Sequence, residues 1–323
     1  MVYGPCGGVR LDGRCEMAEW ACVFADLAEA VPVDPRLGND HPAPPALSVP
    51  LVLTDLSAPP ADAATLRSTA AVLAPSCDAV LLGDHQDRAD FPPSMLARMV
   101  ADAGAVPWVT VACRDRNRVV LQQELNGLAH DGLATVLAVT GDGRAYDVAP
   151  EITQVFDLDS TRLTALAAAA GLTVAVTETP TAPPTGLRPG RLVQKQRAGA
   201  GVAVLNHVPG AAEVERFVVA ARAAGLTVPV IAAVAVYTDE RSAAVLDALP
   251  GLDLDPSDVA RVLTAADPVA AGIDHAVEQA GRLLAIDGVV GVNLSGMVSD
   301  RSVADAAGIQ AEIGHRIRAE HRR

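Results

Sequence analysis

The fold is decided by the stretch Val109-Thr-Val-Ala-Cys113-Arg114-Asp115-Arg116-Asn117-Arg118 and by the later stretch Ala138-Val-Thr140-Gly141-Asp142. Each belongs to a short apolar run, typical of a buried strand, that ends in a polar turn. Residues 118–130 between them have the pattern of a helix, and Asp115 lies near its N-terminus, where an anion is favoured. A carboxylate just after a buried parallel strand is typical of the catalytic face of a β/α barrel.

The same alternation continues along the chain. The candidate strands are residues 51–54, 79–82, 108–112, 135–139, 173–176, 202–205, 228–232 and 289–293. The candidate helices are residues 61–73, 94–103, 118–130, 160–170, 188–198, 211–224, 265–285 and 304–320, with two further helical stretches at 242–249 and 256–265. Alternating strands and helices imply a parallel sheet, and a count of eight favours a closed (β/α)8 TIM barrel over an open doubly wound sheet.

Length and composition agree with one barrel and a short extension. A barrel needs roughly 250 residues, and this chain has 323, half of them hydrophobic. We expect residues 1–48 to form a Cys-rich segment with a linker, and residues 49–323 to form the barrel. The net charge of −14 argues against nucleic acid or an anionic membrane as the main partner. The sequence has neither a long apolar run nor a signal peptide, which predicts a cytoplasmic protein.

Polar residues follow most of the predicted strands. Asp55, Asp84 and Asp142 are three carboxylates expected to converge on one mouth, where like charges raise one another's pKa and allow one to act as a general acid. The remaining polar residues at strand ends are His85, Cys113 to Asn117, Glu178, Asn206, His207, Tyr237, Asn293 and Ser295.

Three of the five cysteines, Cys6, Cys15 and Cys22, lie within the first 22 residues. Clustered cysteines in a cytoplasmic protein favour a metal over disulfides, so zinc or an iron–sulfur cluster is one interpretation. A fourth ligand would come from His41, Cys77 or a partner chain. The other interpretation is three reduced thiols that pack a small N-terminal cap.

The motifs at the strand ends resemble the methylenetetrahydrofolate reductase family over roughly residues 51–296, most clearly at 113–117, 121–122, 139–142 and 155–160. This resemblance implies a β8α8 barrel that reduces 5,10-methylenetetrahydrofolate to 5-methyltetrahydrofolate, with FAD as cofactor and NAD(P)H or another donor as reductant. It also implies a folate substrate, and we expect a homo-oligomer or a partner subunit.

The resemblance assigns roles to individual residues. Asp142 matches an aspartate near flavin and pterin, and Lys195 matches a lysine that contacts the flavin. Asp55 stands where the family has the glutamate that protonates the folate, and Asn206 stands where it has a substrate-binding glutamine. The predicted catalytic residues are therefore Asp55, Asp142 and Asn206, and the predicted cofactor-binding residues are Asp84, Cys113, Arg114, Asp115, Arg116, Asn117, Thr140, Gly141 and Lys195.

The sequence also departs from the family. Asp55 and Asn206 are each one methylene shorter than the family's residues, Thr110 replaces a histidine, and Gly83 replaces a threonine. These departures support two alternatives: a flavin-independent folate enzyme of the same fold, or a non-catalytic metal-binding subunit. The N-terminal cysteine block resembles a Cys-rich module of proteins associated with this family, which implies a metal or iron–sulfur cluster at Cys6, Cys15 and Cys22.

Overall fold

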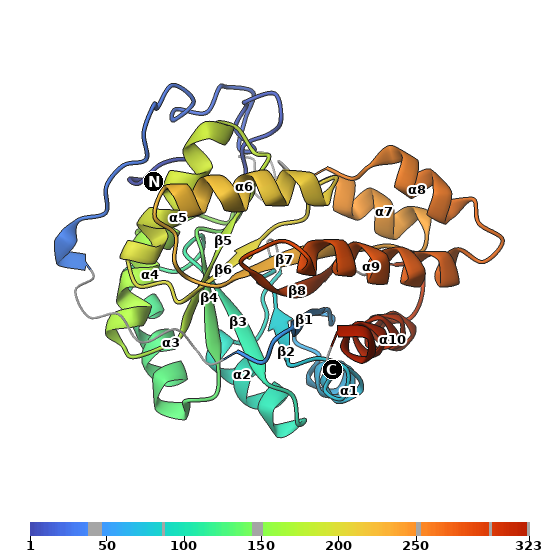
Figure 1. Cartoon of the computed structure of the whole chain (residues 1–323). Coiled ribbons are helices and arrows are strands. Elements are labelled where there is room, and N and C mark those ends of the chain that lie inside the picture. Colours follow the sequence, from blue (N-terminus) through green and yellow to red (C-terminus); the bar gives the residue numbers. More distant parts are fainter. Residues whose placement is uncertain (38–46, 86–87, 144–150, 250–252, 297–298, 322–323) are drawn as a thin grey trace.

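The computed structural model describes residues 1–37, 47–85, 88–143, 151–249, 253–296 and 299–321. Within these residues, eight parallel strands close into one barrel in the order β1 to β8, with β8 paired to β1 (Figure 1). The strands are β1 (Leu51–Leu56), β2 (Ala79–Leu82), β3 (Pro107–Ala112), β4 (Thr135–Val139), β5 (Val174–Glu178), β6 (Val202–Leu205), β7 (Val230–Val236) and β8 (Val289–Gly296). The predicted (β/α)8 TIM barrel is confirmed.

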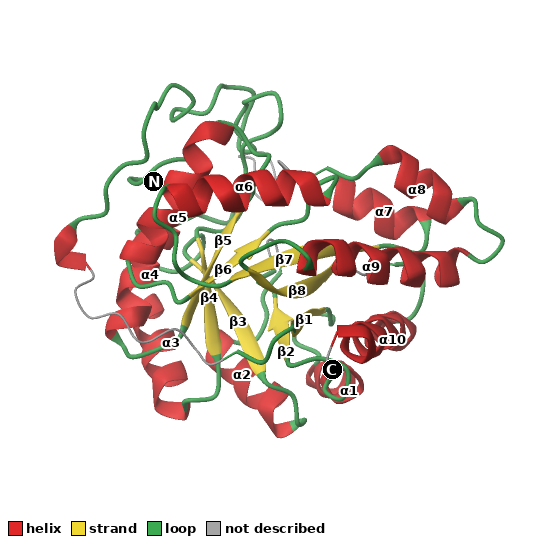
Figure 2. Cartoon of the chain, viewed as in Figure 1, coloured by secondary structure: helices red, strands yellow, loops and turns green. Residues whose placement is uncertain are grey.

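Helices surround the sheet as an outer ring (Figure 2). They are α1 (Ala63–Leu73), α2 (Pro93–Asp102), α3 (Arg118–Asp131), α4 (Ser160–Ala169), α5 (Arg188–Arg197), α6 (Ala211–Ala223), α7 (Glu240–Asp247), α8 (Pro256–Leu263), α9 (Pro268–Leu284) and α10 (Val303–His321), with 3-10 turns η1 (Pro35–Leu37) and η2 (Thr185–Leu187). Side chains at several N-termini accept backbone N–H groups, among them Asp62 before α1, Asn117 before α3 and Asp159 before α4. Such caps fix where each helix begins.

The strands are apolar almost throughout because both of their faces are buried. On β1, Leu51 and Leu53 pack inside the barrel with Trp108 and Ile231. The neighbouring Val52 belongs to the larger core between the sheet and the helices. Alternate side chains of a strand point to opposite faces, so one run of small branched residues fills both layers.

The structure corrects the C-terminal ends of four predicted strands, β1, β5, β7 and β8, and the change is largest for the last two. β7 extends to Val236 and β8 to Gly296, and the two remain paired as far as those residues. A separate apolar cluster explains the extension, because Ala235 and Tyr237 pack there against Leu246, Leu254 and Val262 of the inserted α7–α8 region.

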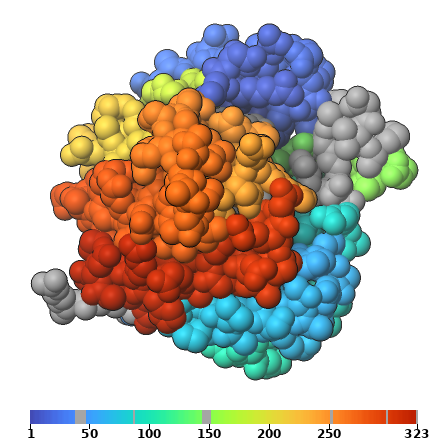
Figure 3. Space-filling view, turned by 90° about the vertical axis from the view of Figure 1, so that its right-hand side faces the viewer, coloured from blue at the N-terminus to red at the C-terminus, as the bar shows by residue number. Residues whose placement is uncertain are grey.

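The N-terminal segment, residues 1–37, has little regular structure and runs beside α4 and α5 (Figure 1). Two isolated bridges, Val9 with Cys15 and Arg14 with Ala21, fold its first part into a compact turn. In the space-filling view this segment covers one end of the molecule (Figure 3). Among the described residues, no helix combines the length and the apolar character needed to cross a bilayer.

Candidate functional site

A cavity of about 280 Å³ lies at the end of the barrel where the strands terminate. Its walls come from the ends of β2 to β6, from α5, and from the N-terminal segment, which contributes Cys6 and Gly7. The lining residues are Cys6, Gly7, Gly83, Asp84, Thr110, Ala112, Arg114, Leu137, Val139, Thr140, Gly141, Asp142, Ser160, Thr177, Arg191, Lys195, Asn206 and Leu249. The structure thus brings together seven of the residues predicted for catalysis or cofactor binding: Asp84, Arg114, Thr140, Gly141, Asp142, Lys195 and Asn206.

Arg114 is buried and organises one wall. Its Nε donates to Asp115 Oδ2 at 2.8 Å, and its Nη2 donates to Asp84 Oδ1 at 3.3 Å. The guanidinium also donates to the backbone oxygens of His85 and Asp142 at 2.8 and 3.3 Å. Arg116 Nη1 lies 2.5 Å from the other oxygen of Asp84. These contacts use most of the donors of Arg114, so its role here is to hold three loops in place.

A second cavity of about 350 Å³ adjoins the first. The two share Gly83, Asp84 and Thr110 in their walls. Asp115 and Arg116 line the second cavity only. The absence of a side chain at Gly83 and the short side chain of Thr110 leave room where the cavities meet.

The turn after β4 needs glycine. Gly141 has φ +89°, and a Cβ there would lie 3.0 Å from the Cβ of Arg114. Thr140 Oγ1 accepts the backbone N–H of Ser160 at 3.1 Å, which ties the turn to the start of α4. Asp142 follows at the exposed rim, where surrounding protein raises the pKa of its carboxyl and Arg114 opposes the shift. A carboxyl with a raised pKa is suited to proton transfer near neutral pH.

Asp55 faces the barrel interior, because it lies two residues beyond the inward-facing Leu53 on β1. Its Oδ1 accepts from Asn293 Nδ2 at 2.9 Å. Burial raises the pKa of Asp55, and hydrogen bonds from Asn293, Ser295 and Gly296 lower it in part. The sequence predicts that a raised pKa at this mouth comes from the neighbouring charges of Asp84 and Asp142. The structure instead places Asp55 outside the lining of the cavity that those two share.

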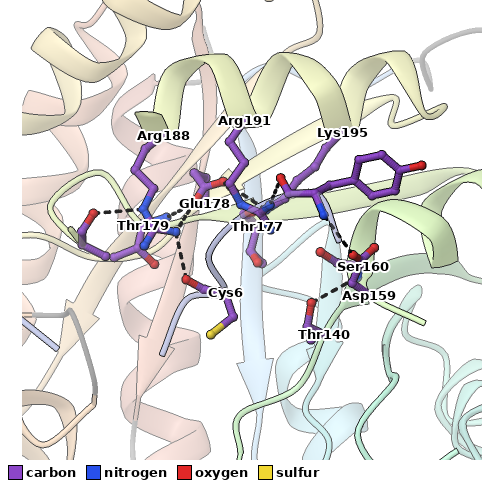
Figure 4. Close-up of polar contacts among 12 residues, drawn as sticks. Cys6, Thr140, Asp159, Ser160, Thr177, Glu178, Thr179, Arg188, Arg191 and Lys195 are labelled. Atoms are coloured by element: carbon purple, nitrogen blue, oxygen red, sulfur yellow. Dashed lines mark hydrogen bonds and ion pairs between the residues drawn. The ribbon is translucent and has the colours of Figure 1, made fainter. Parts of the chain in front are cut away.

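A buried charge cluster joins β5 to α5, as Figure 4 shows. Glu178 lies 3.0 Å from Arg188 Nη1, 3.6 Å from Arg191 Nε and 3.1 Å from Lys195 Nζ. Lys195 also donates to the backbone oxygen of Thr177. All four charged side chains are at most 5% exposed. One carboxylate therefore faces three cations, two of which, Arg191 and Lys195, line the cavity.

This imbalance explains why the pKa values of both Glu178 and Lys195 are lowered. Burial alone would raise the pKa of Glu178, but Lys195, Arg188 and Arg191 outweigh it and lower the value to about 2. Burial lowers the pKa of Lys195 to about 8, and the neighbouring arginines add to that effect against the attraction of Glu178. The carboxylate gains from three partners, whereas each cation is repelled by two others.

Sequence reasoning did not find Arg188 and Arg191. Their spacing of three and four residues with Lys195 places all three on one face of α5, and that pattern is visible in the sequence. Arg188 also donates to the backbone oxygens of Cys6, Ala182 and Pro183. Arg191 Nη1 donates to the backbone oxygen of Tyr3 at 2.8 Å. The cluster thus holds the N-terminal segment against the barrel.

Two predicted cofactor-binding residues lie elsewhere. Cys113 is fully buried in the core between sheet and helices, where burial raises the pKa of its thiol to about 12. Asn117 caps α3 by accepting the backbone N–H of Val120 at 3.0 Å. Both side chains have evident roles in the fold.

The N-terminal cysteines are all in the thiol form. In the part of the chain that the structure describes, no three His, Cys, Asp or Glu side chains form a group that could hold a metal ion. His41 lies outside the described residues, and Cys77 is buried near the end of α1. Metal binding by Cys6, Cys15 and Cys22 stays a prediction. Burial raises the pKa of the Cys6 thiol to about 11, and the charge of Glu16 adds to the shift.

No family model matches the chain, and no curated protein matches it. Solved structures do resemble it in fold. An uncharacterized protein from Clostridium thermocellum that binds two copies of 5-methyl-5,6,7,8-tetrahydrofolic acid is 13% identical, with a TM-score of 0.57 over 87% of this chain and 97% of that one. A mutant tryptophan synthase alpha-subunit from Pyrococcus furiosus is 12% identical, with a TM-score of 0.52 over 85% of this chain and 100% of the other. At such identities the likeness shows that these chains share the barrel fold.

Proposed function

We propose that this protein is an enzyme of one-carbon metabolism that binds a reduced folate at the C-terminal ends of its barrel strands. In its finer form, the proposal is reduction of 5,10-methylenetetrahydrofolate to 5-methyltetrahydrofolate. The observation that carries it is the joint presence of Asp142, Asn206 and Thr177 in one cavity at the catalytic end of the barrel. The Clostridium neighbour, which binds a methylated reduced folate, supports the same ligand class.

The polar groups of the cavity suit a pterin ring. A pterin presents an amino group and ring N–H groups, which pair with carboxylate and carbonyl oxygens. Asp142 supplies such a carboxylate on the β4 side, and Asn206 supplies an amide on the β6 side. The Asn206 amide is oriented by its Nδ2, which donates to Thr179 Oγ1 at 2.8 Å. The apolar floor of Leu137 and Val139 would contact the ring itself.

The acidic tail of a folate, or the phosphates of a cofactor, would be drawn to the α5 side of the cavity. Arg191 is 3% exposed, and its Nε has no hydrogen-bond partner among the described residues. Lys195 uses one side-chain oxygen of Glu178 and one backbone oxygen. A buried cation without its own counter-charge is costly, and a ligand anion would remove that cost.

Asp55 is the proposed proton donor to the folate. Opening the five-membered ring of methylenetetrahydrofolate requires protonation of a ring nitrogen, and a carboxyl can supply that proton only while it is protonated. Burial on the interior face of β1 raises the pKa of Asp55 and so favours the protonated form. Asn293 holds the carboxyl in place through its amide hydrogen bond.

A flavin is the hydride source that the family resemblance implies. The described residues fit the ring part of such a group, because two cavities meet at Gly83 and Thr110 and would hold two ring systems side by side. Asp84 would border both rings, and Lys195 with Arg191 would receive the diphosphate. When bound, the flavin would take a hydride from NAD(P)H or another donor and pass it to the folate.

One observation favours the flavin-independent alternative. The guanidinium groups of Arg114 and Arg116 are already paired with Asp84, and Arg114 is paired with Asp115 as well. These arginines therefore have little capacity left for a cofactor. In the alternative the protein binds the folate alone and transfers its one-carbon unit to an acceptor.

Purification without added cofactor distinguishes the two forms. The flavin-dependent form predicts a yellow protein with flavin absorbance, or a colourless one that binds added FAD and then forms 5-methyltetrahydrofolate with NAD(P)H. A colourless protein that binds 5-methyltetrahydrofolate but not FAD would support the alternative. A protein that binds neither FAD nor any reduced folate would contradict the proposed function.

A further inference from the structure

The first seven residues of the N-terminal segment contact α4, α5 and the wall of the cavity. Val2 N donates to Asp159 Oδ2 at 2.9 Å, where α4 begins. The backbone oxygens of Tyr3 and Cys6 accept from Arg191 and Arg188 of α5. Cys6 and Gly7 then form part of the cavity wall. The segment is therefore a component of the site rather than a separate appendage.

Glu16, in the same N-terminal segment, contacts the residue that follows Asp142. Its Oε1 accepts the backbone N–H of Gly143 at 2.8 Å, across 127 residues of sequence. Gly143 directly follows Asp142, so this bond fixes the C-terminal side of the turn that carries the carboxylate. Arg114 and Gly141 fix the other side, through the hydrogen bond to the Asp142 oxygen and the tight approach of Gly141 to Arg114.

Two glycines make room for this contact. A Cβ at Gly8 would come 2.0 Å from Cδ of Glu16, and a Cβ at Gly143 would come 1.8 Å from Sδ of Met17. The backbone N–H of Glu16 donates to the Gly8 oxygen at 3.0 Å, which holds Glu16 over Gly8. A side chain at Gly8 would therefore force the Glu16 side chain to move, and one at Gly143 would force the Met17 side chain to move.

We propose that Glu16 is a positioning residue, supplied by the N-terminal segment, which holds the Thr140 to Gly143 turn so that Asp142 faces the ligand. The inference rests on the proposed function in one respect: it takes Asp142 as a ligand-contacting residue. Glu16 acts through the Gly143 amide and lies outside the cavity lining.

The test uses the full chain and three variants. Glu16→Ala removes the acceptor, whereas Glu16→Gln keeps a side-chain oxygen that can accept the same N–H. Gly8→Ala leaves the carboxylate but displaces it through the clash at Cδ. Glu19→Ala is the matched control, because Glu19 lies in the same segment and its ion pairs are with Arg10 and Arg14.

The first measurement is hydrogen exchange of the Gly143 amide, which needs no ligand. Loss of the hydrogen bond from the Gly143 N–H to Glu16 should make local opening easier, so Glu16→Ala and Gly8→Ala should speed exchange by roughly tenfold. Glu16→Gln and Glu19→Ala should stay within about threefold of wild type, since neutral acceptors are only modestly weaker. Unchanged exchange in Glu16→Ala would overturn the proposal.

The second measurement is the affinity for 5-methyltetrahydrofolate by calorimetry. We expect binding to weaken roughly tenfold in Glu16→Ala, because a displacement of the Asp142 carboxylate by about 1 Å is enough to lose its contact with the ligand. Affinity should recover in Glu16→Gln. The urea midpoint of unfolding should be the same in wild type and both variants. Equal affinity in wild type and Glu16→Ala would contradict the positioning role. If wild type does not bind the folate, the proposed function fails, and the exchange experiment alone decides the inference.

Discussion

At the scale of single residues, the two carboxyls expected to carry chemistry have different surroundings. Asp142 lies at the exposed rim of the cavity beside Arg114. Asp55 lies on the interior face of β1, held by the amide of Asn293 and by Ser295. The surrounding protein disfavours the ionised form of both carboxyls and so raises both pKa values, but only Asp142 lines the cavity. Under the proposed function Asp142 binds the folate, and Asp55 donates a proton to the folate from the barrel interior.

Asp55→Asn should stabilise the protein at neutral pH and abolish its activity toward the folate. A carboxyl whose pKa is raised by folding binds its proton more tightly in the folded state, so its contribution to stability falls as pH rises through its ordinary pKa to the folded one. The amide of asparagine cannot ionise, so the folded state no longer bears the cost of a buried charge. Asp55→Asn should therefore raise the melting temperature at pH 7 and leave it unchanged at pH 3. Folate turnover should be lost, while reduction of any bound flavin by its donor should continue.

The exposed Asp287, just before β8, serves as the control for this change. Asp287→Asn should alter neither the melting temperature nor turnover. Full folate turnover in Asp55→Asn would show that another group donates the proton.

His207 predicts a separate pH dependence of folding. Its side chain is 2% exposed after β6, and burial lowers its pKa to about 4. Between about pH 4 and pH 6.5 the unfolded chain binds a proton that the folded chain does not, so stability rises with pH across this window. At pH 5 the loss relative to pH 7 should be on the order of 2 kcal/mol.

Urea unfolding at pH 5 and pH 7 measures this effect. His207→Gln should reduce the difference between the two pH values, whereas the same change at the exposed His130 should preserve it. An unchanged difference in His207→Gln would rule out His207 as its source.

At the scale of elements, the contact between β5 and α5 depends on charge. Glu178 ends β5, and the three cations line one face of α5. The same cations hold the N-terminal segment through the backbone oxygens of Tyr3 and Cys6. This one carboxylate compensates a buried positive cluster. Its loss should therefore weaken the packing of β5, α5 and the N-terminal segment against one another.

Glu178→Gln should be strongly destabilising. Removing one partner of a buried ion pair costs about 3–5 kcal/mol because the remaining charge is left uncompensated. The folded-state pKa of about 2 also means that wild-type stability from Glu178 is complete above about pH 4.5 and is lost as pH falls toward 2. Urea unfolding at pH 7 measures the first effect, with the exposed Glu215→Gln of α6 as control. A cost of Glu178→Gln no larger than that of the control would contradict this account.

The periodicity of the sequence was sufficient to predict the strands and helices of the barrel. Both faces of each strand are buried, so apolar runs stand out, and caps such as Asn117 mark where helices begin. The ion pairs of Glu178 were not predicted, because pairing across a loop depends on how a strand and a helix face each other. The same limit explains Cys113: its position after β3 was predicted, but its direction into the helix-facing core was not.

At the scale of the whole molecule, the barrel and the N-terminal segment form one site. The turns after β2, β3 and β4 meet around Arg114, α5 supplies the cations, and residues 3 to 17 close the remaining side. The clustered cysteines of this segment predict a metal site. Their spacing does not predict that the segment contacts the mouth of the barrel. Of the site residues predicted from the sequence, seven do line one cavity: Asp84, Arg114, Thr140, Gly141, Asp142, Lys195 and Asn206.

The central claim is that the cavity at the barrel mouth binds a reduced folate. Calorimetric titration of the purified chain with 5-methyltetrahydrofolate tests it most directly, with Asp142→Asn as the site variant and Asp287→Asn, at the opposite end of the barrel, as the control. We predict saturable binding that weakens roughly tenfold or more in Asp142→Asn, as expected for a lost hydrogen bond to a charged group, and is unchanged in Asp287→Asn. No binding by wild type, or equal binding by wild type and Asp142→Asn, would contradict the claim.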